Sequence, residues 1–183
     1  MMPIIILGVI VLFIFYAISV YNRLIQGRIH VKEGWSGIDV QLKRRYDLIP
    51  NLVETVKGYM QHERGVLENV TKLRAQVMGT GDLKEKAVLE NNLSQALKSI
   101  FAVAENYPDL KANQNFIDLQ KNLNEIENEI QLARRYYNGT VRNYNTDIQS
   151  FPSNIVASMF GFKEADFFEV EGAQERATPQ VKF

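Results

Sequence analysis

The chain has 183 residues, 21 basic and 21 acidic side chains, and no cysteine. This length allows one sizeable domain once a membrane segment is set aside, and it suffices for a hydrophobic core without disulfides or metals. A balanced net charge provides no field to attract nucleic acid, so we expect no nucleic-acid partner. The lack of cysteine excludes a disulfide framework, thiolate catalysis and cysteine-bound zinc.

An uncharged apolar run occupies residues 3–21, PIIILGVIVLFIFYAISVY. As a helix, these roughly 19 residues would extend about 28 Å, which matches the hydrocarbon core of a bilayer. A cleaved signal peptide is the alternative, since small residues near the end of the run offer a possible cleavage site. The lack of Lys or Arg before the run, together with Tyr16 and Tyr21 near its end, favours a retained anchor at residues 1–22.

The charges that flank this run predict its orientation. Arg23, Arg28 and Lys32 follow it closely, whereas only the terminal amine precedes it. By the positive-inside rule, the part of the chain after the run lies in the cytoplasm. We therefore expect a single-pass protein of the inner or plasma membrane with a cytoplasmic domain.

The segment after the anchor is predicted to continue as a helix. Residues 22–47 contain no proline, although Gly27, Gly34 and Gly37 weaken their helical preference. Pro50 has no N–H and would clash with the carbonyl four residues earlier, so it predicts a kink or a restart of the helix.

Beyond this proline, apolar residues recur at steps of three and four. They run from Leu52 to Val77 with one interruption at Glu63, which predicts a single amphipathic helix. The glycines of residues 78–82 then predict a stop, and Asp82 can cap the start of the next helix.

Two further segments have the same helical spacing. They cover residues 83–104 and residues 113–148, the second with a coiled-coil-like seam that requires partner helices of similar length. Because short turns leave each helix only the space beside its predecessor, the sequence predicts an antiparallel, all-α bundle. We place this bundle at residues 23–160, and a packed or partly extended tail at residues 161–183.

Lys43, Arg44 and Arg45 form the strongest basic cluster of the sequence. Close to a membrane anchor, such a cluster can contact anionic lipid headgroups or a protein partner. A solvated helix face is the alternative interpretation.

Glu63 interrupts an apolar stripe, where a charge must be paired, hydrated or protonated. Arg134 and Arg135 lie beside the seam of the last long helical segment. One hypothesis is therefore a structural ion pair between Glu63 and one of these two arginines.

Nothing in the sequence predicts a catalytic residue, a metal site or a cofactor. His62 and Glu63 resemble the start of the zinc-protease motif HExxH, but Val66 stands where the second histidine is required. A di-iron bundle needs Glu-x-x-His pairs, which this chain lacks. We therefore expect no enzymatic activity.

Four segments carry a specific resemblance to a known family. They are WSGIDVQLKRRYDLIPNLVETVKGY from Trp35, ENYPDLKANQNF from Glu105, ARRYYNGTVRNYNT from Ala133 and FPSNIVASMFGF from Phe151. The chain resembles the LemA family over nearly its whole length. This resemblance implies a bacterial single-span membrane protein with a helical-bundle domain and no established enzymatic activity. It also suggests a role in membrane maintenance or membrane-protein quality control.

Two functions therefore stand as hypotheses. The first is a membrane-anchored scaffold or adaptor that presents a helix face to an as yet unknown protein partner. The second is a domain that binds lipid or a small ligand at the membrane surface.

Overall fold

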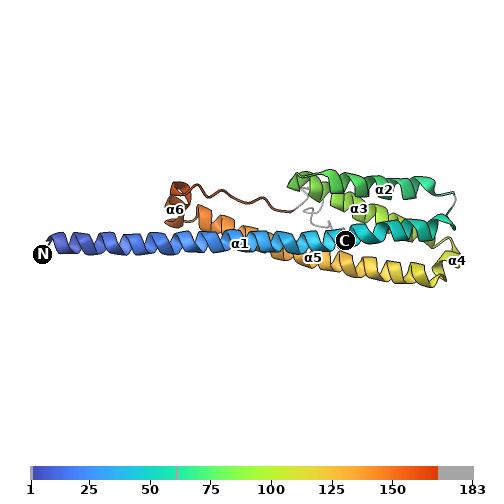
Figure 1. Ribbon diagram of the computed structural model, residues 1–183, viewed down its shortest axis with the longest axis horizontal. Helices are drawn as coiled ribbons and strands as arrows, with labels where there is room; N and C mark the ends of the chain where they lie inside the picture. The colour runs from blue at the N-terminus through green and yellow to red at the C-terminus, as the bar shows by residue number, and fades with distance from the viewer. Residues whose placement is uncertain (1, 61, 169–183) are drawn as a thin grey trace, which may run out of the picture. The chain divides into compact units, whose positions relative to one another are not determined.

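The computed structural model describes residues 2–60 and 62–168. Within these ranges the chain forms helices and no strand, which confirms the predicted all-α fold (Figure 1). The helices are α1 (Met2–Lys57), α2 (Arg64–Gly79), α3 (Leu83–Ala104), α4 (Pro108–Lys111), α5 (Gln114–Gln149) and α6 (Ser153–Met159).

The described residues fall into two compact units. The first unit comprises residues 2–43 with residues 128–167, and the second comprises residues 44–127 with Phe168. Both α1 and α5 contribute one part to each unit. The predicted boundaries at residues 22 and 160 stay predictions, and residues 169–183 of the predicted tail lie outside the described residues.

The second unit is a four-helix arrangement. It contains the end of α1, then α2, α3 and the start of α5, which are joined by short connections and run antiparallel (Figure 1). Apolar side chains from each helix are buried in its core, among them Ile49, Leu52, Val56, Val70, Val77, Leu93, Ile100, Phe116 and Leu123. This is the predicted bundle, formed by the three-four spacing that gives each helix one apolar stripe.

The prediction of one helix from Leu52 to Val77 is wrong. The chain leaves α1 after Lys57 and enters α2 at Arg64, with Glu63 immediately before α2. The apolar spacing continues across the connection because both helices turn their stripes to the same core. Glu63 interrupts the stripe at the point where the chain changes direction.

Pro50 does not restart the helix, since α1 continues through it to Lys57, and the alternative of a kink at this position stays a prediction. A proline in a helix leaves the carbonyl four residues earlier without its usual donor, and here that carbonyl belongs to Tyr46. Nε of Arg74 on α2 donates a hydrogen bond to this oxygen at 2.8 Å. The neighbouring helix thus replaces the donor that Pro50 lacks.

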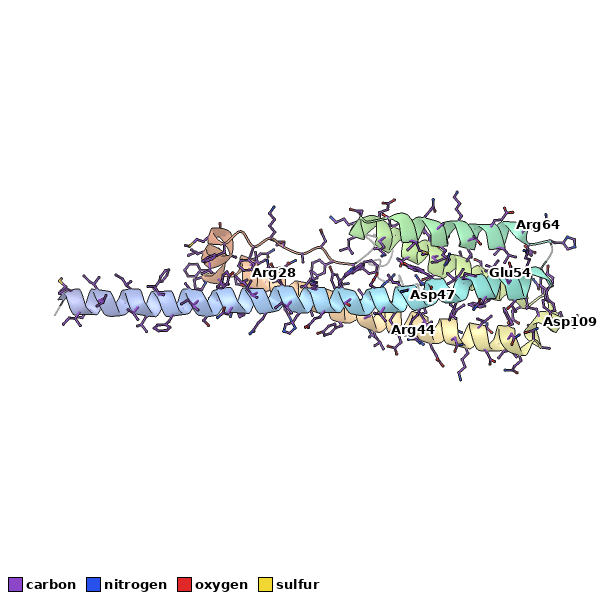
Figure 2. All side chains as sticks on the ribbon, viewed as in Figure 1. Arg28, Arg44, Asp47, Glu54, Arg64 and Asp109 are labelled. Carbon is purple, nitrogen blue, oxygen red and sulfur yellow. The ribbon has the colours of Figure 1, made fainter. Side chains whose placement is uncertain are left out.

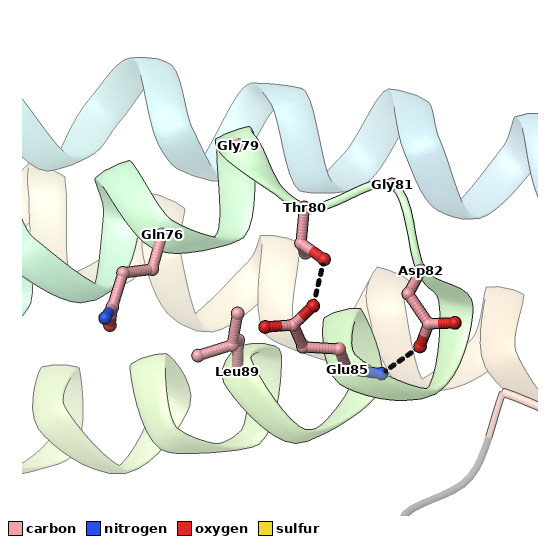
Figure 3. Close-up of a pocket in the computed structure, with 7 residues that line it drawn as sticks. All are labelled: Gln76, Gly79, Thr80, Gly81, Asp82, Glu85 and Leu89. Carbon is pink, nitrogen blue, oxygen red and sulfur yellow. Dashed lines mark hydrogen bonds between the residues drawn. The ribbon is translucent and has the colours of Figure 1, made fainter.

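The turn between α2 and α3 agrees with the sequence prediction. Thr80 and Gly81 connect the two helices, and an Asp82 carboxylate oxygen accepts a hydrogen bond from the Glu85 N–H at 2.8 Å (Figure 3). Asp82 is therefore the N-cap of α3, because it satisfies one of the donors that a helix start leaves unpaired.

The first unit packs α1 against the second half of α5 and against α6. Val20 and Leu24 of α1 form a buried cluster with Tyr144 of α5 and with Val156 and Ala157 of α6. These side chains fix α6 beside α1 through apolar burial.

Two of the three glycines predicted to weaken α1 permit this close packing. An added Cβ at Gly34 would lie 3.2 Å from Cα of Tyr137, and one at Gly27 would lie 3.0 Å from the Tyr144 ring. A Cβ at Gly37 would meet open space. At Gly27 and Gly34, the lower helix propensity of glycine accompanies a close approach of α5, whereas at Gly37 no such contact explains it.

The N-terminal part of α1 is exposed although it is almost wholly apolar. Its exposed side chains include those of Ile4, Leu7, Leu12, Phe13, Phe15 and Ile18. By length and composition, α1 is the one helix of the described residues that could cross a membrane. It is therefore a candidate membrane-spanning helix.

Candidate functional site

The structure separates the three residues of the predicted basic cluster. Lys43 and Arg44 are exposed on α1, where Figure 2 labels Arg44, whereas the Arg45 side chain is fully buried. Successive residues of a helix point about 100° apart, so one of three consecutive side chains can face the core. The expectation that Arg45 contributes to a lipid or partner surface is corrected by this burial. For Lys43 and Arg44 it stays a prediction.

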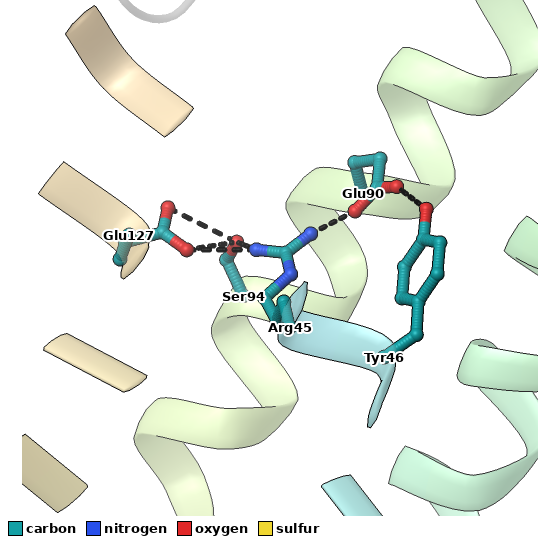
Figure 4. A network of polar contacts seen from close by, with 5 residues as sticks. All are labelled: Arg45, Tyr46, Glu90, Ser94 and Glu127. Atoms are coloured by element: carbon teal, nitrogen blue, oxygen red, sulfur yellow. Dashed lines mark hydrogen bonds and ion pairs between the residues drawn. The ribbon is translucent and has the colours of Figure 1, made fainter. Parts of the chain in front are cut away.

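Arg45 lies at the centre of a polar network inside the second unit (Figure 4). Its guanidinium pairs with Glu90 on α3 through Nη2, and through Nη1 it lies 2.7 Å from a Glu127 carboxylate oxygen on α5. Nη1 also donates to Ser94 Oγ at 2.8 Å, and the Tyr46 hydroxyl donates to Glu90.

This network joins α1, α3 and α5 through side chains with little or no access to solvent. Arg45 and Glu90 are fully buried, and Glu127 is about a quarter exposed. Burying two charges is costly, and the cost is offset only by close pairing and additional hydrogen bonds. The network therefore favours one arrangement of the three helices over others, which is a structural role.

The sequence contained a signal for this network that the prediction missed. Arg45 occupies an apolar-stripe position, three residues after Leu42 and four before Ile49. Glu90 likewise lies three residues after Ala87 and three before Leu93. Opposite charges at core positions of two helices predict an ion pair.

The residues of the other predicted ion pair belong to different units. Glu63 precedes α2 in the second unit and is half-buried, whereas Arg134 and Arg135 lie on the part of α5 that belongs to the first unit. The pairing of Glu63 with either arginine stays a prediction.

A groove runs along α1 and α2 in the second unit, with a volume of about 640 Å³. Its floor includes Met60 and Leu67, which are buried. Its rim carries the exposed cations Lys57, Arg64 and Lys72; Figure 2 labels Arg64 at the start of α2. An apolar floor with a mainly cationic rim suits an amphipathic ligand with negative charge.

A smaller hollow of about 420 Å³ lies at the turn between α2 and α3 (Figure 3). Three of its polar side chains stabilise the turn itself. Thr80 donates to the Glu85 carboxylate at 2.6 Å, and Asp82 caps α3. This hollow is therefore a feature of the turn rather than a site with groups available for chemistry.

Metal ligands are not gathered in the described part of the chain. No group of three or more His, Asp or Glu side chains there could hold a metal ion. His62 is exposed in the connection before α2, and His30 forms an exposed contact with Glu33 at 3.2 Å. The expected absence of enzymatic activity stays a prediction.

An aromatic cluster in the first unit lies just after the exposed apolar part of α1. The Tyr21 ring packs edge to face on Phe160 and Phe162, with centroid distances of 4.8 and 5.7 Å. The Arg28 guanidinium lies 5.6 Å from the centre of the Phe162 ring. Such edge-to-face and cation–π contacts orient the rings as well as bury them.

Two tyrosines on α5 have altered acidity in this unit. Burial raises the pKa of Tyr137, and the negative charge of Asp166 raises it further. Burial also raises the pKa of Tyr144, although Arg28 acts in the opposite direction. The Tyr137 hydroxyl donates to the main-chain oxygen of Asp166 at 2.8 Å, so the raised pKa of Tyr137 reflects packing of the segment after α6.

Comparison with known proteins assigns the chain to a family. The LemA family model matches residues 34–183, which is most of the chain. The chain belongs to the LemA family. The match begins after the exposed apolar part of α1, so that segment lies outside the family region.

Named relatives agree with this LemA assignment. The chain is 25% identical to magnetosome protein MamQ 2 of Paramagnetospirillum magneticum, in an alignment that covers 94% of the chain and 74% of the relative. It is 24% identical to protein LemA of Metamycoplasma hominis, covering 86% of the chain and 73% of that relative. It is 23% identical to magnetosome protein MamQ of Magnetospirillum gryphiswaldense, covering 80% of the chain and 64% of the relative.

Proposed function

We propose that this LemA-family chain is a membrane-anchored, non-enzymatic scaffold that binds a protein partner through its helical bundle. The observation that carries the anchoring is the exposed apolar part of α1. Side chains such as Leu12 and Phe15 are exposed there without any charged neighbour from residue 2 to residue 22. In water such a surface is unfavourable, whereas in a bilayer it is solvated by acyl chains.

The orientation proposed for this anchor follows from the flanking charges. Arg23, Arg28 and Lys32 lie close to the end of the apolar run along the helix. The positive-inside rule then assigns the bundle to the cytoplasmic side of the inner or plasma membrane.

The groove along α1 and α2 supports the partner-binding part of the proposal. Met60 and Leu67 offer an apolar floor, and Arg64 and Lys72 offer cations at its rim. An acidic amphipathic helix of the partner matches both features. Anchoring raises the effective concentration of this groove toward partners in the same membrane.

Two experiments on the full-length chain test these two parts. For anchoring, membranes are extracted with alkaline carbonate, and the chain is expected to stay with the lipid fraction. Release into the soluble fraction would contradict the anchor. For partner binding, a photo-crosslinking amino acid is placed at Thr71 in the groove or at Ser99, an exposed control position on α3.

We expect a discrete protein adduct from Thr71 that is absent from Ser99. The double variant Arg64→Glu and Lys72→Glu should weaken this adduct, because it reverses the charge of the rim. Equal adducts from the two positions, or no effect of charge reversal, would contradict binding in the groove.

The groove volume favours one second candidate, the binding of a lipid or small ligand. Its roughly 640 Å³ lie within the usual range of small-molecule sites. Native mass spectrometry of the purified chain distinguishes the two candidates. A bound small molecule that the charge-reversal variant loses, without a protein adduct from Thr71, would favour the ligand-binding function.

A further inference from the structure

The segment around α6 exposes an apolar surface close to the proposed anchor. Residues 148–162 contain no charged side chain. Within this segment, the exposed fractions are 81% for Phe151, 46% for Ile155, 73% for Met159 and 58% for Phe160. Scattered apolar residues on a surface are ordinary, but four within ten residues without a charge indicate an interaction surface.

The opposite face of α6 is fully used in packing. Val156 and Ala157 are buried in the cluster with Val20 and Leu24 of α1. The segment is therefore held on α1 by one apolar face while the other remains exposed. All of these contacts lie within the first unit.

The end of α6 brings the chain back to α1 at a defined position along the α1 axis. Gly161 has a φ of +68°, a conformation that glycine adopts without strain, and the Phe162 N–H donates to the Ala157 oxygen at 2.9 Å. This helix-ending turn lets both Phe160 and Phe162 contact the Tyr21 ring. These contacts place the end of α6 beside Tyr21 along the α1 axis.

The position of Tyr21 along α1 coincides with the expected edge of the bilayer. The apolar run of α1 ends at Tyr21, and its length of about 28 Å is close to the roughly 30 Å of a hydrocarbon core. Each headgroup layer adds roughly 5–8 Å. The Phe160 and Phe162 rings, packed edge to face on Tyr21 at 4.8 and 5.7 Å, therefore fall in the boundary layer between acyl chains and headgroups.

The charges beside this segment fit the same position. Arg23 lies 3.2 Å from Asp147, and Arg28 covers the Phe162 ring, both within two turns of Tyr21. Lys163 is exposed directly after the uncharged segment. Aromatic rings bordered by cations are typical of membrane interfaces, because the rings reach the acyl chains and the cations reach the headgroups.

We propose that Phe151, Ile155, Met159 and Phe160 form a second membrane contact, in which α6 lies in the bilayer interface beside the anchor. This inference rests on the proposed anchoring by α1. It implies that the lipid surface, rather than a protein, covers the exposed face of α6. The membrane contact would then fix the rotation of α1 about its axis, which a single span alone leaves free.

Site-directed spin labelling tests this inference, and the absence of native cysteine allows single labels in the full-length chain. The chain is reconstituted into vesicles of phosphatidylcholine and phosphatidylglycerol. Labels are placed at Met159→Cys on α6, Leu12→Cys in the anchor and Ser99→Cys on α3, all exposed positions. Collision rates with oxygen, which enters lipid, and with a water-soluble nickel chelate are then measured.

We expect the label at Met159 to collide several-fold less with nickel than the label at Ser99, and more with oxygen. The label at Leu12 should show the strongest preference for oxygen. A second label at Phe151→Cys should repeat the result of Met159, which guards against a local effect of one substitution.

The other outcomes separate the two proposals. A lipid-exposed Leu12 with a Met159 label as accessible to nickel as Ser99 would overturn the interfacial contact and leave the anchor intact. A nickel-accessible Leu12 would overturn both. A Met159 label shielded from both reagents, with dipolar broadening between labels, would overturn the lipid contact in favour of a second copy of the chain.

Discussion

Arg74 of α2 donates a hydrogen bond at 2.8 Å to the main-chain oxygen of Tyr46, the acceptor that Pro50 leaves without a helical donor. A proline inside a helix usually costs about 3 kcal/mol, partly because this carbonyl loses its partner. In the second unit, a side chain of the next helix provides the partner. The contact couples the direction of α2 to the position of the proline in α1.

This coupling predicts an effect of Arg74 that depends on Pro50. The variant Arg74→Met should lower the free energy of unfolding by about 1–2 kcal/mol, because the Tyr46 oxygen loses a charged donor. In a Pro50→Ala background the same change should cost less, since the main-chain N–H gained at this position can bond to that oxygen. Urea unfolding of the four proteins in a double-mutant cycle measures the difference. Equal costs in both backgrounds would contradict the coupling.

The buried pair of Arg45 and Glu90 predicts a large loss of stability when one partner is removed. Arg45→Met should cost about 3–5 kcal/mol, because it leaves the Glu90 carboxylate in the core without its cation. The double variant Arg45→Met and Glu90→Leu should recover most of this loss. Arg44→Met is the matched control, since Arg44 is exposed, and it should change stability by less than about 0.5 kcal/mol.

Urea unfolding of the full chain in detergent provides these values. Similar losses for Arg44→Met and Arg45→Met would contradict the buried network. A double variant that is no more stable than Arg45→Met would show that the pair has no specific energetic coupling.

Two glycines of α1 predict opposite effects of the same substitution. Gly34→Ala should destabilise the first unit, because the new Cβ would lie 3.2 Å from the Tyr137 Cα, which belongs to a helix backbone and cannot rotate away. Gly37→Ala should stabilise α1 by about 0.5–1 kcal/mol, because its Cβ meets open space and alanine favours the helix. Thermal melting of both variants tests the sign, and a stabilising Gly34→Ala would contradict the close helix contact.

The raised pKa of Tyr137 leads us to expect a loss of stability at alkaline pH. Its pKa in the folded chain is raised above the ordinary value of 10.0, first by burial and then by Asp166. The protonated phenol therefore stabilises the fold below pH 10, and this contribution disappears as the pH rises from about 10 through the folded-state pKa. Tyr137→Phe removes the titrating group and should flatten this part of the pH dependence.

Near neutral pH, Tyr137→Phe should cost about 1 kcal/mol, because the hydrogen bond to the Asp166 oxygen is lost. Urea unfolding at about pH 8 and near pH 11, on either side of the ordinary tyrosine pKa, measures both effects. Tyr136→Phe is the matched control, since Tyr136 is the exposed neighbour on α5. An identical alkaline slope in the Tyr137 and Tyr136 variants would contradict the assignment.

Replacing Asn145 is expected to open the segment after α6 locally. Its side chain donates to the Ala165 oxygen and accepts from the Ala165 N–H, each at 2.9 Å. Asn145→Ala should increase hydrogen exchange at the Ala165 amide by roughly ten- to a hundredfold, as expected for two lost hydrogen bonds. Asn145→Asp keeps an acceptor for the N–H and should give an intermediate rate. An unchanged rate in Asn145→Ala would show that other contacts hold the segment.

The sequence alone determined the helical fold and several of its local features. The three-four spacing of apolar residues predicted the antiparallel bundle, because that spacing places them on one side of a helix. The glycines near residue 80 and the carboxylate of Asp82 predicted the turn between α2 and α3. Glycine commonly ends a helix, and an Asp carboxylate accepts hydrogen bonds from the unpaired N–H groups at the start of the next one. The uncharged run that ends at Tyr21 identified the candidate anchor by its length.

Only the tertiary structure decided which neighbours complete those patterns. The apolar spacing did not reveal that α1 ends at Lys57 and α2 begins at Arg64. Both helices face the same core, and the three-four spacing continues from one into the other. It also could not show that Arg74 replaces the donor missing at Pro50, or that Arg45 turns inward to Glu90. These contacts join residues 28 and 45 positions apart, and such distant pairs are defined by packing rather than by local preference.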